Sequence, residues 1–127
     1  MQILHYAGCS TCRKARAWLV SRGIPVTERD IVGQPPTKAE LARWIPASGL
    51  PVRKWLNTSG LSYRALGRER IAAMSDAQLV DALSRDGKLV KRPVLIADGR
   101  VLIGFSPEVW STLEPPARSR SVPGRKR

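Results

Sequence analysis

Cys9 and Cys12 are the only two cysteines of the chain, and the Ser10-Thr11 pair between them makes a CxxC motif. The motif follows a short apolar run and opens a segment with helical spacing. At a strand-to-helix junction the first sulfur lies at the helix N-terminus, where unpaired backbone N–H groups and the helix dipole favour a thiolate. The second sulfur, one turn later, can attack a mixed disulfide formed at the first. The spacing therefore predicts thiol–disulfide chemistry, with Cys9 as nucleophile and Cys12 as resolving thiol.

Basic residues follow the motif directly, at Arg13, Lys14 and Arg16. Positive charge near a thiol favours its ionised form and attracts anions. We therefore expect Arg13 to contribute to binding an anionic substrate. The alternative interpretation of the two cysteines is that both are small buried hydrophobic residues.

Two further positions are candidates for the same site. His5 lies four residues before Cys9, at the end of the first apolar run, although a lone histidine is often structural or solvated. Arg92 precedes Pro93, which opens a later apolar run. A proline at the start of a strand opposite the CxxC suggests a cis peptide bond. Such a bond would turn a backbone edge toward the sulfur and leave Arg92 near it, whereas residue type alone also fits a surface charge.

Composition limits the class of protein. A chain of 127 residues with 43% hydrophobic residues and four tryptophans fits one packed domain. It contains no run of 18 apolar residues and no leader pattern, so we expect a cytoplasmic protein without membrane contact. In a reducing compartment a CxxC is catalytic, regulatory or metal-binding rather than a structural disulfide. A structural zinc needs four ligands, and His5 is the one histidine available, so we expect no metal unless two molecules share a site.

Charge is concentrated toward the C-terminus. The formal net charge is +12, of which +5 comes from residues 115–127, a segment without acidic residues. This segment is rich in Pro, Ser and Arg and cannot bury enough apolar surface to fold alone, so we expect a disordered basic tail. It either contacts nucleic acid or is simply solvated chain.

The hydrophobic pattern predicts strands over residues 3–6 and 26–31, joined by a helix over 11–22, as a parallel βαβ unit. Residues 35–86 show helical signals alone. A capping box at Thr37 and Glu40 starts a helix that runs to about residue 46, a short helix spans 51–57, and a third spans 75–86. Strands at 94–96 and 101–103 flank an Asp98-Gly99 hairpin turn, and a final helix follows Ser106. We therefore predict an α/β thioredoxin-like fold, β-α-β … β-β-α, as one domain over residues 1–114 with a helical insertion at about 35–86.

The motifs resemble the glutaredoxin-linked branch of the arsenate reductase family, together with Spx and related uncharacterised reductase-like proteins, over residues 2–114. The resemblance rests on five segments: Cys9 to Ala15, Gln34 to Leu41, Asn57-Thr58-Ser59-Gly60 with Tyr63-Arg64, Lys91-Arg92-Pro93, and Gly104-Phe105. It implies a thioredoxin-like fold with a helical insert, in agreement with the pattern of elements. Asn57 to Gly60 and Gly104-Phe105 are more similar to the uncharacterised reductase-like members than to Spx.

In this family the resemblance implies that Cys9 attacks arsenate, that His5 supports its thiolate, and that three arginines hold the oxyanion. Arg92 matches one arginine position, while the other two fall on Asn57 and Phe105. The expected catalytic residues are Cys9, Cys12 and His5, and the expected substrate contacts are Arg92, Arg13, Asn57 and Pro93. We expect no bound cofactor, with glutathione and glutaredoxin, or thioredoxin, as electron donor.

These observations predict a monomeric thiol-dependent reductase whose substrate is arsenate, another small anion or a disulfide, with Cys12 or glutathione resolving the adduct. The alternative is an Spx-like transcription regulator that binds the RNA polymerase α subunit and is switched by a Cys9–Cys12 disulfide. A non-catalytic interaction module with the same fold is a third interpretation.

Overall fold

The computed structural model describes residues 1–113, so the predicted basic tail at 115–127 lies outside the described residues. Four strands form one sheet in the order β2-β1-β3-β4: β1 (Gln2–His5), β2 (Thr27–Asp30), β3 (Val94–Ala97) and β4 (Arg100–Ile103). Strands β1 and β2 are parallel, whereas β3 is antiparallel to both β1 and β4. This topology confirms the predicted β-α-β … β-β-α arrangement.

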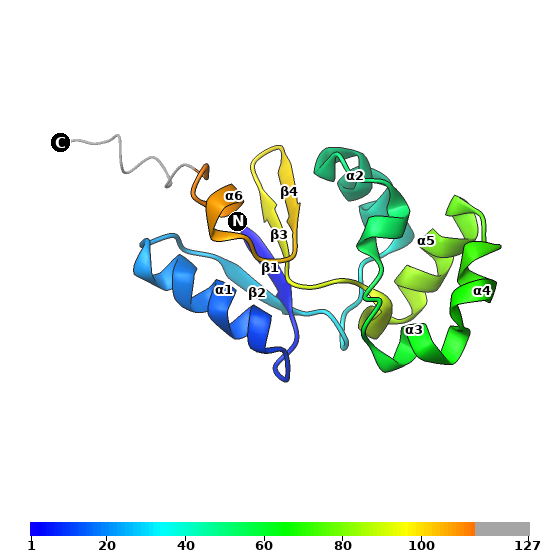
Figure 1. Cartoon of the computed structure of the whole chain (residues 1–127). Helices are drawn as coiled ribbons and strands as arrows, with labels where there is room; N and C mark the ends of the chain where they lie inside the picture. The colour runs from blue at the N-terminus through cyan, green and yellow to red at the C-terminus, as the bar shows by residue number, and fades with distance from the viewer. Residues whose placement is uncertain (114–127) are drawn as a thin grey trace.

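One face of the sheet is covered by α1 (Ser10–Ser21) and the short α6 (Pro107–Trp110), as Figure 1 shows. The alternation of side chains along β1 and β3 sends Ile3 and Leu95 to this face, where they pack with Leu19 and Trp110. All four side chains are at most 1% exposed. Helix α1, whose N-terminal end carries the two cysteines, is therefore held against the sheet by a packed layer.

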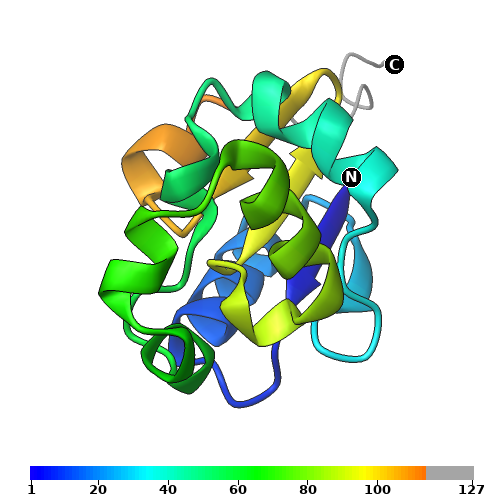
Figure 2. The ribbon, with the colours of Figure 1, turned by 90° about the vertical axis from the view of Figure 1, so that its right-hand side faces the viewer.

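The helical insertion covers the opposite face, as Figure 2 shows. It consists of α2 (Lys38–Ser48), α3 (Leu61–Leu66), α4 (Arg68–Ala72) and α5 (Asp76–Arg85), with 3-10 turns at Val52–Trp55 and Gly87–Leu89. Leu4 from β1 packs with Leu41, Trp55 and Leu83 from this layer. Within residues 1–113 no helix is both long enough and apolar enough to cross a lipid bilayer.

The insertion differs in detail from the sequence prediction. Helices α3 and α4 were not predicted, because each has at most six residues and neither begins with a side-chain cap. Gly67, with a φ of 90°, both ends α3 and precedes α4. Helix α2 continues through Pro46 and ends at Gly49, where a left-handed residue is needed. The short helix expected over 51–57 is a 3-10 turn, Val52–Trp55.

Two contacts fasten the insertion to the sheet. Both carboxylate oxygens of Glu40, in the first turn of α2, accept hydrogen bonds from Arg29 of β2 at 2.8 Å, and Glu40 also completes the capping box with Thr37. At the other end of the insertion, Gly87 lies so close to the backbone of Ile31 that an added Cβ would be 1.8 Å from the Ile31 carbonyl oxygen. The return to β3 therefore requires glycine at this position.

Candidate functional site

Cys9 caps the N-terminus of α1. Its backbone N–H donates to the Tyr6 carbonyl at 3.0 Å, which closes the turn after β1. Its Sγ accepts the Cys12 backbone N–H at 3.2 Å, so the sulfur takes the place that a Ser or Asp oxygen occupies in other helix caps. A hydrogen bond from a helix N-terminus stabilises negative charge on this sulfur.

Cys12 lies one turn further along α1 and is 1% exposed, whereas Cys9 is half-buried. Burial raises the pKa of the Cys12 thiol to about 12, and the hydrogen bond between the Cys12 and Cys9 side chains acts in the same direction. The hydrogen bond to the Tyr6 backbone and the charge of Arg92 oppose this rise in pKa. Cys12 is therefore a protonated thiol at neutral pH.

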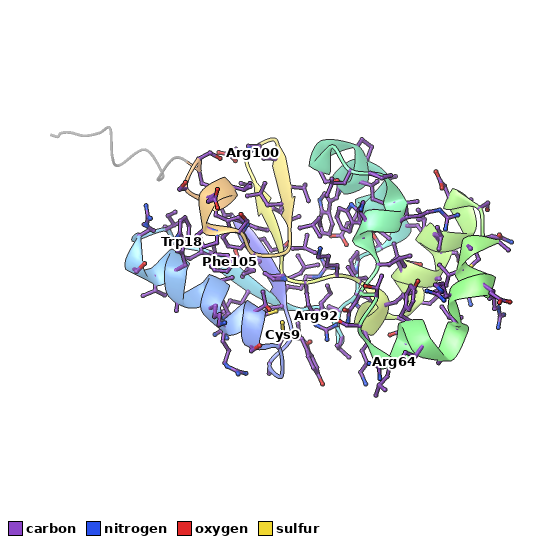
Figure 3. All side chains as sticks on the ribbon, viewed as in Figure 1. Cys9, Trp18, Arg64, Arg92, Arg100 and Phe105 are labelled. Carbon is purple, nitrogen blue, oxygen red and sulfur yellow. The ribbon has the colours of Figure 1, made fainter. Side chains whose placement is uncertain are left out.

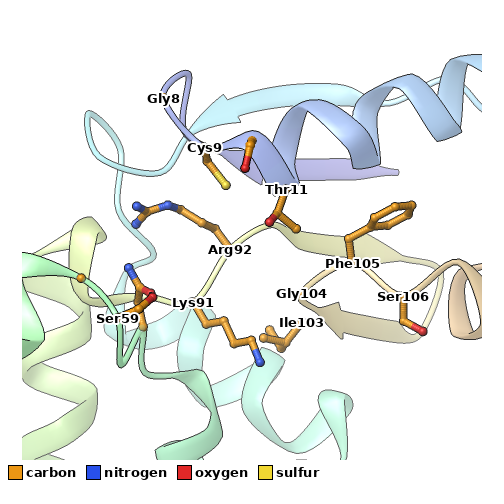
Figure 4. A pocket seen from close by; sticks show the side chains of 13 residues that line it. Gly8, Cys9, Thr11, Ser59, Lys91, Arg92, Ile103, Gly104, Phe105 and Ser106 are labelled. Atoms are coloured by element: carbon orange, nitrogen blue, oxygen red, sulfur yellow. The ribbon is translucent and has the colours of Figure 1, made fainter.

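Cys9 opens into a pocket of about 690 Å³ between the sheet and the helical insertion (Figure 4). Four segments line it: residues 8–11 before and in α1, Asn57 with residues 59–60, Lys91 with Arg92, and residues 103–106 after β4. Lys91 and Arg92 are the charged side chains among these described lining residues, and none of the lining residues is acidic. The pocket therefore favours an anionic group beside the Cys9 sulfur.

Arg92 lies next to the sulfur in the close view of the pocket (Figure 4). The Arg92–Pro93 peptide bond is cis, as predicted. The guanidinium lies 4.9 Å from the centre of the Tyr6 ring and donates to the Lys88 carbonyl at 3.4 Å. Asn57 donates its side-chain amide to the same carbonyl at 3.4 Å. The two side chains are thus tied to one backbone oxygen at the pocket wall.

Comparison with known proteins places this geometry in a family. The ArsC family model matches residues 4–113. The chain belongs to the ArsC family. A structure described as a putative ArsC family related protein from Bacteroides fragilis is 45% identical, with a TM-score of 0.84, and covers 89% of this chain and 97% of that one. The resemblance stated from the sequence motifs is confirmed.

Relatives within the ArsC family carry different names. The uncharacterized protein YusI of Bacillus subtilis (strain 168) is 42% identical over 101 residues, 79% of this chain and 86% of YusI. An arsenate reductase of Rhizobium meliloti (strain 1021) is 34% identical over 95 residues, 75% of this chain and 67% of the reductase. The regulatory protein MgsR of Bacillus subtilis (strain 168) is 28% identical over 102 residues, 80% of each chain.

The structure gathers some of the predicted ArsC-type site residues and separates others. Cys9, Arg92 and Asn57 line one pocket. Arg13 turns back to donate to the Ala7 carbonyl at 3.4 Å and lines a different groove, along α1 and β2. Pro93 is buried and is not among the lining residues.

Phe105 occupies a position where the family resemblance expects an arginine. Its ring makes edge-on contacts with Trp110, at 5.0 Å between ring centres, and with Trp18, at 6.2 Å. The Phe105 and Trp18 labels lie close together on the α1 side of the sheet in Figure 3. The Phe105 ring therefore packs into the aromatic cluster on the α1 side of the sheet and brings no charge to the pocket that it lines.

Lys91 is the charged residue among the described lining residues that the sequence analysis did not assign to the site. The Lys91 side chain passes close to Gly104. A Cβ added to Gly104 would lie 3.3 Å from Lys91 Cε, so glycine leaves room for the lysine. The sequence signal for Lys91 was its position next to Arg92. The fold then shows that both side chains line the pocket. Within residues 1–113, no three His, Cys, Asp or Glu side chains come together as a metal site.

Proposed function

We propose that this protein is a thiol-dependent reductase in which Cys9 attacks a small anionic disulfide or oxyanion. The observation that carries the proposal is the position of Cys9 Sγ, which accepts a helix N-terminal N–H and opens into the pocket that holds Lys91 and Arg92. A thiolate is the reactive form of cysteine, and this position stabilises it.

In the first step the Cys9 thiolate attacks one sulfur of the substrate disulfide. A Cys9–substrate disulfide forms, the substrate S–S bond breaks, and the second sulfur leaves as a thiolate. Lys91 and Arg92 compensate the negative charge of substrate and leaving group, since both line the pocket into which the sulfur points. With arsenate, the thiolate forms an S–As bond and one arsenate oxygen leaves as water; attack of a second thiol on Cys9 Sγ then breaks the S–As bond, and arsenic leaves as arsenite with the two electrons of that bond.

In the second step Cys12 attacks Cys9 Sγ. The Cys9–Cys12 disulfide forms, the bond to the substrate sulfur breaks, and Cys12 gives up its proton. In the reduced protein Cys9 Sγ already accepts the Cys12 backbone N–H at 3.2 Å, so the two residues are adjacent before the attack. An external dithiol such as thioredoxin, or two molecules of glutathione with glutaredoxin, then supplies two electrons and restores both thiols.

The pocket supports a disulfide substrate more strongly than a bare oxyanion. Its volume of about 690 Å³ lies in the range typical of sites for drug-sized molecules, and a single tetrahedral anion would leave most of it empty. Arg92 is in place, but Asn57 and Phe105 occupy the other two positions where the family resemblance expects arginines. Each missing charge-assisted hydrogen bond is worth about 1.5–3 kcal/mol of anion binding.

The test is NADPH consumption with arsenate and, separately, with a glutathione-containing mixed disulfide. Each substrate is assayed with the thioredoxin system and with glutathione plus glutaredoxin. Turnover that is lost in Cys9→Ser is the expected result, and Cys12→Ser shows whether the second cysteine or glutathione resolves the adduct. Undiminished turnover in Cys9→Ser, or no turnover with any pair of substrate and donor, contradicts the proposal.

A redox-switched regulator is the second candidate, favoured by the paired cysteines and by the relative named regulatory protein MgsR. In that case the Cys9–Cys12 disulfide alters a surface that binds the RNA polymerase α subunit. Binding measured with oxidised and reduced protein distinguishes the two candidates. A large difference in affinity supports the regulator, and equal or absent binding removes it.

A further inference from the structure

His5 is the only histidine of the chain, and neither step described above assigns it a task. It ends strand β1, and its side chain is 14% exposed. Its Nδ1 atom is buried and has no hydrogen-bond partner among the described residues. Buried polar atoms without partners are uncommon in folded proteins and ask for an explanation.

The other imidazole nitrogen is held by an ion-pair cluster. His5 Nε2 lies 3.2 Å from Glu28 Oε1 on the neighbouring strand β2. Arg16 of α1 reaches the same carboxylate, with its Nη2 3.0 Å from Oε1 and 3.2 Å from Oε2. A carboxylate beside Nε2 favours the tautomer with the proton on Nε2, which leaves a lone pair on Nδ1. Glu28 thus makes the buried nitrogen a proton acceptor.

The cluster lies under the same face of α1 as the cysteines. Cys9, Cys12 and Arg16 follow one another at spacings of three and four residues, so they share one side of the helix. His5 is two residues from Ile3 on β1, and Ile3 packs on the α1 side of the sheet. The Cys12 side chain is hydrogen-bonded to the backbone of Tyr6, the residue next to His5. The resolving thiol and the imidazole therefore both lie between α1 and the sheet, on the side where Arg16 reaches Glu28.

Cys12 needs a base when it acts as the resolving thiol, because it is buried and carries its proton at neutral pH. The charged or ionisable groups that act on Cys12 are Cys9 and Arg92. Those that contact His5 and its partner are Glu28 and Arg16. Among these groups the imidazole is the one with a free acceptor atom inside the protein.

We propose that His5 Nδ1 takes the proton of Cys12, directly or through one water, as Cys12 attacks the Cys9 mixed disulfide, and that Glu28, braced by Arg16, positions the imidazole for this step. The Cys12 S–H bond breaks and the Cys9–Cys12 bond forms, while the substrate sulfur leaves as a thiolate that takes the proton up from His5 or from water. This inference rests on the proposed function and adds a base and a positioning residue to its second step.

The reaction with one equivalent of 5,5′-dithiobis(2-nitrobenzoate), an anionic disulfide that releases a coloured thiolate, separates the two steps. The first release reports attack by Cys9, and the second reports resolution by Cys12. We expect Cys12→Ser to abolish the second release alone. If wild-type protein shows no release that depends on Cys9, the proposed function fails and this inference fails with it.

Glu28→Gln keeps the size of the side chain and removes its charge. We expect it to slow the second release about tenfold, the rate equivalent of one hydrogen bond to a charged group, and to leave the first release unchanged. His5→Gln should slow the second release about 100-fold, the usual contribution of a general base. The matched control is Asp81→Asn, since Asp81 also joins two cations, Lys38 and Arg85, on the far side of the insertion; it should change neither release.

The double variant decides whether Glu28 acts through His5. In the His5→Gln background, Glu28→Gln should have no further effect on the second release. If Glu28→Gln matches wild type, or slows the second release equally with and without His5, the inference is overturned. Nitrogen-15 spectra of the single imidazole give an independent readout at pH 8: the wild type should hold the proton on Nε2, and Glu28→Gln should populate both tautomers. Unchanged tautomer populations contradict the positioning role even if the variant is less stable.

Discussion

The guanidinium of Arg29 contacts both carboxylate oxygens of Glu40 at 2.8 Å and so joins strand β2 to the first turn of α2. The same guanidinium donates to the carbonyls of Gln34 and Pro35, which precede that helix. One side chain thus fixes the segment by which the helical insertion leaves the sheet.

Glu40→Gln should lower the free energy of unfolding by about 1–3 kcal/mol at pH 7, because it leaves a charged hydrogen-bond partner half satisfied. The hydrogen bonds from Arg29 hold the pKa of Glu40 below its ordinary value of 4.5. The stabilisation is complete above that value and is lost as the pH falls through the lower folded-state pKa. Urea unfolding from pH 7 to pH 3 should therefore show the two proteins converging in acid. A constant difference across this range would contradict the assignment.

Cys12 should make the reduced protein lose stability in alkali. Burial raises its pKa from 9.0 to about 12, so between these values the unfolded chain ionises the thiol while the folded protein keeps the proton. Stability falls with rising pH over this interval, by at most about 1.4 kcal/mol per pH unit. Denaturant unfolding with a reductant at pH 8 to 10.5 should show a steeper decline for wild type than for Cys12→Ala. Parallel curves would show that the thiol ionises equally in both states.

Gly87→Ala should destabilise the fold by about 3 kcal/mol, since the added methyl would overlap the backbone of Ile31 and neither backbone segment can move freely. Gly33→Ala is the matched control. There the added Cβ meets only the Asp30 side chain, at 3.0 Å, and this exposed side chain can shift at the cost of its hydrogen bond from the Val32 N–H. Thermal unfolding of both variants tests the prediction, which is wrong if the two lose equal stability.

The charge of the pocket should select among alkylating reagents. The quantity to measure in reduced protein is the rate of Cys9 modification by anionic iodoacetate divided by the rate with neutral iodoacetamide. Arg92→Ala should lower this ratio about fivefold, which corresponds to the loss of one partly exposed charge interaction. Arg100→Ala controls for net charge, because Arg100 hydrogen-bonds Thr112 on the β4 side of the molecule, outside the pocket. The difference should shrink at high salt. An equal ratio in both variants would remove Arg92 from the anion site.

Local signals were sufficient for most of the fold. The apolar runs, the capping boxes at Thr37 and Ser75, and the Asp98-Gly99 turn each depend on neighbouring residues, so the sequence predicts the corresponding elements. Helices α3 and α4 were not predicted from the sequence, because they are short and uncapped and their formation depends on packing against the rest of the insertion.

Site residues could be predicted where a reactive or charged residue type stands in a recognisable local sequence pattern. The CxxC spacing predicts Cys9 and Cys12 as site residues, and the proline that follows Arg92 predicts Arg92. Lys91 was not predicted, because its side chain reaches the pocket past Gly104, a residue distant in the sequence. Arg13 was expected in the pocket but lines another groove, since its side chain folds back to Ala7. Its role as a substrate contact stays a prediction.

Strand β2 forms one edge of the sheet, and its four residues are Thr27, Glu28, Arg29 and Asp30. An open edge made of apolar residues would be a template onto which a strand of another molecule could add. Charged side chains on both faces of β2 make such addition costly, because the incoming strand would have to strip them of water. Glu28 and Arg29, which bind α1 and the insertion, therefore also protect the protein from edge-to-edge aggregation in a concentrated solution.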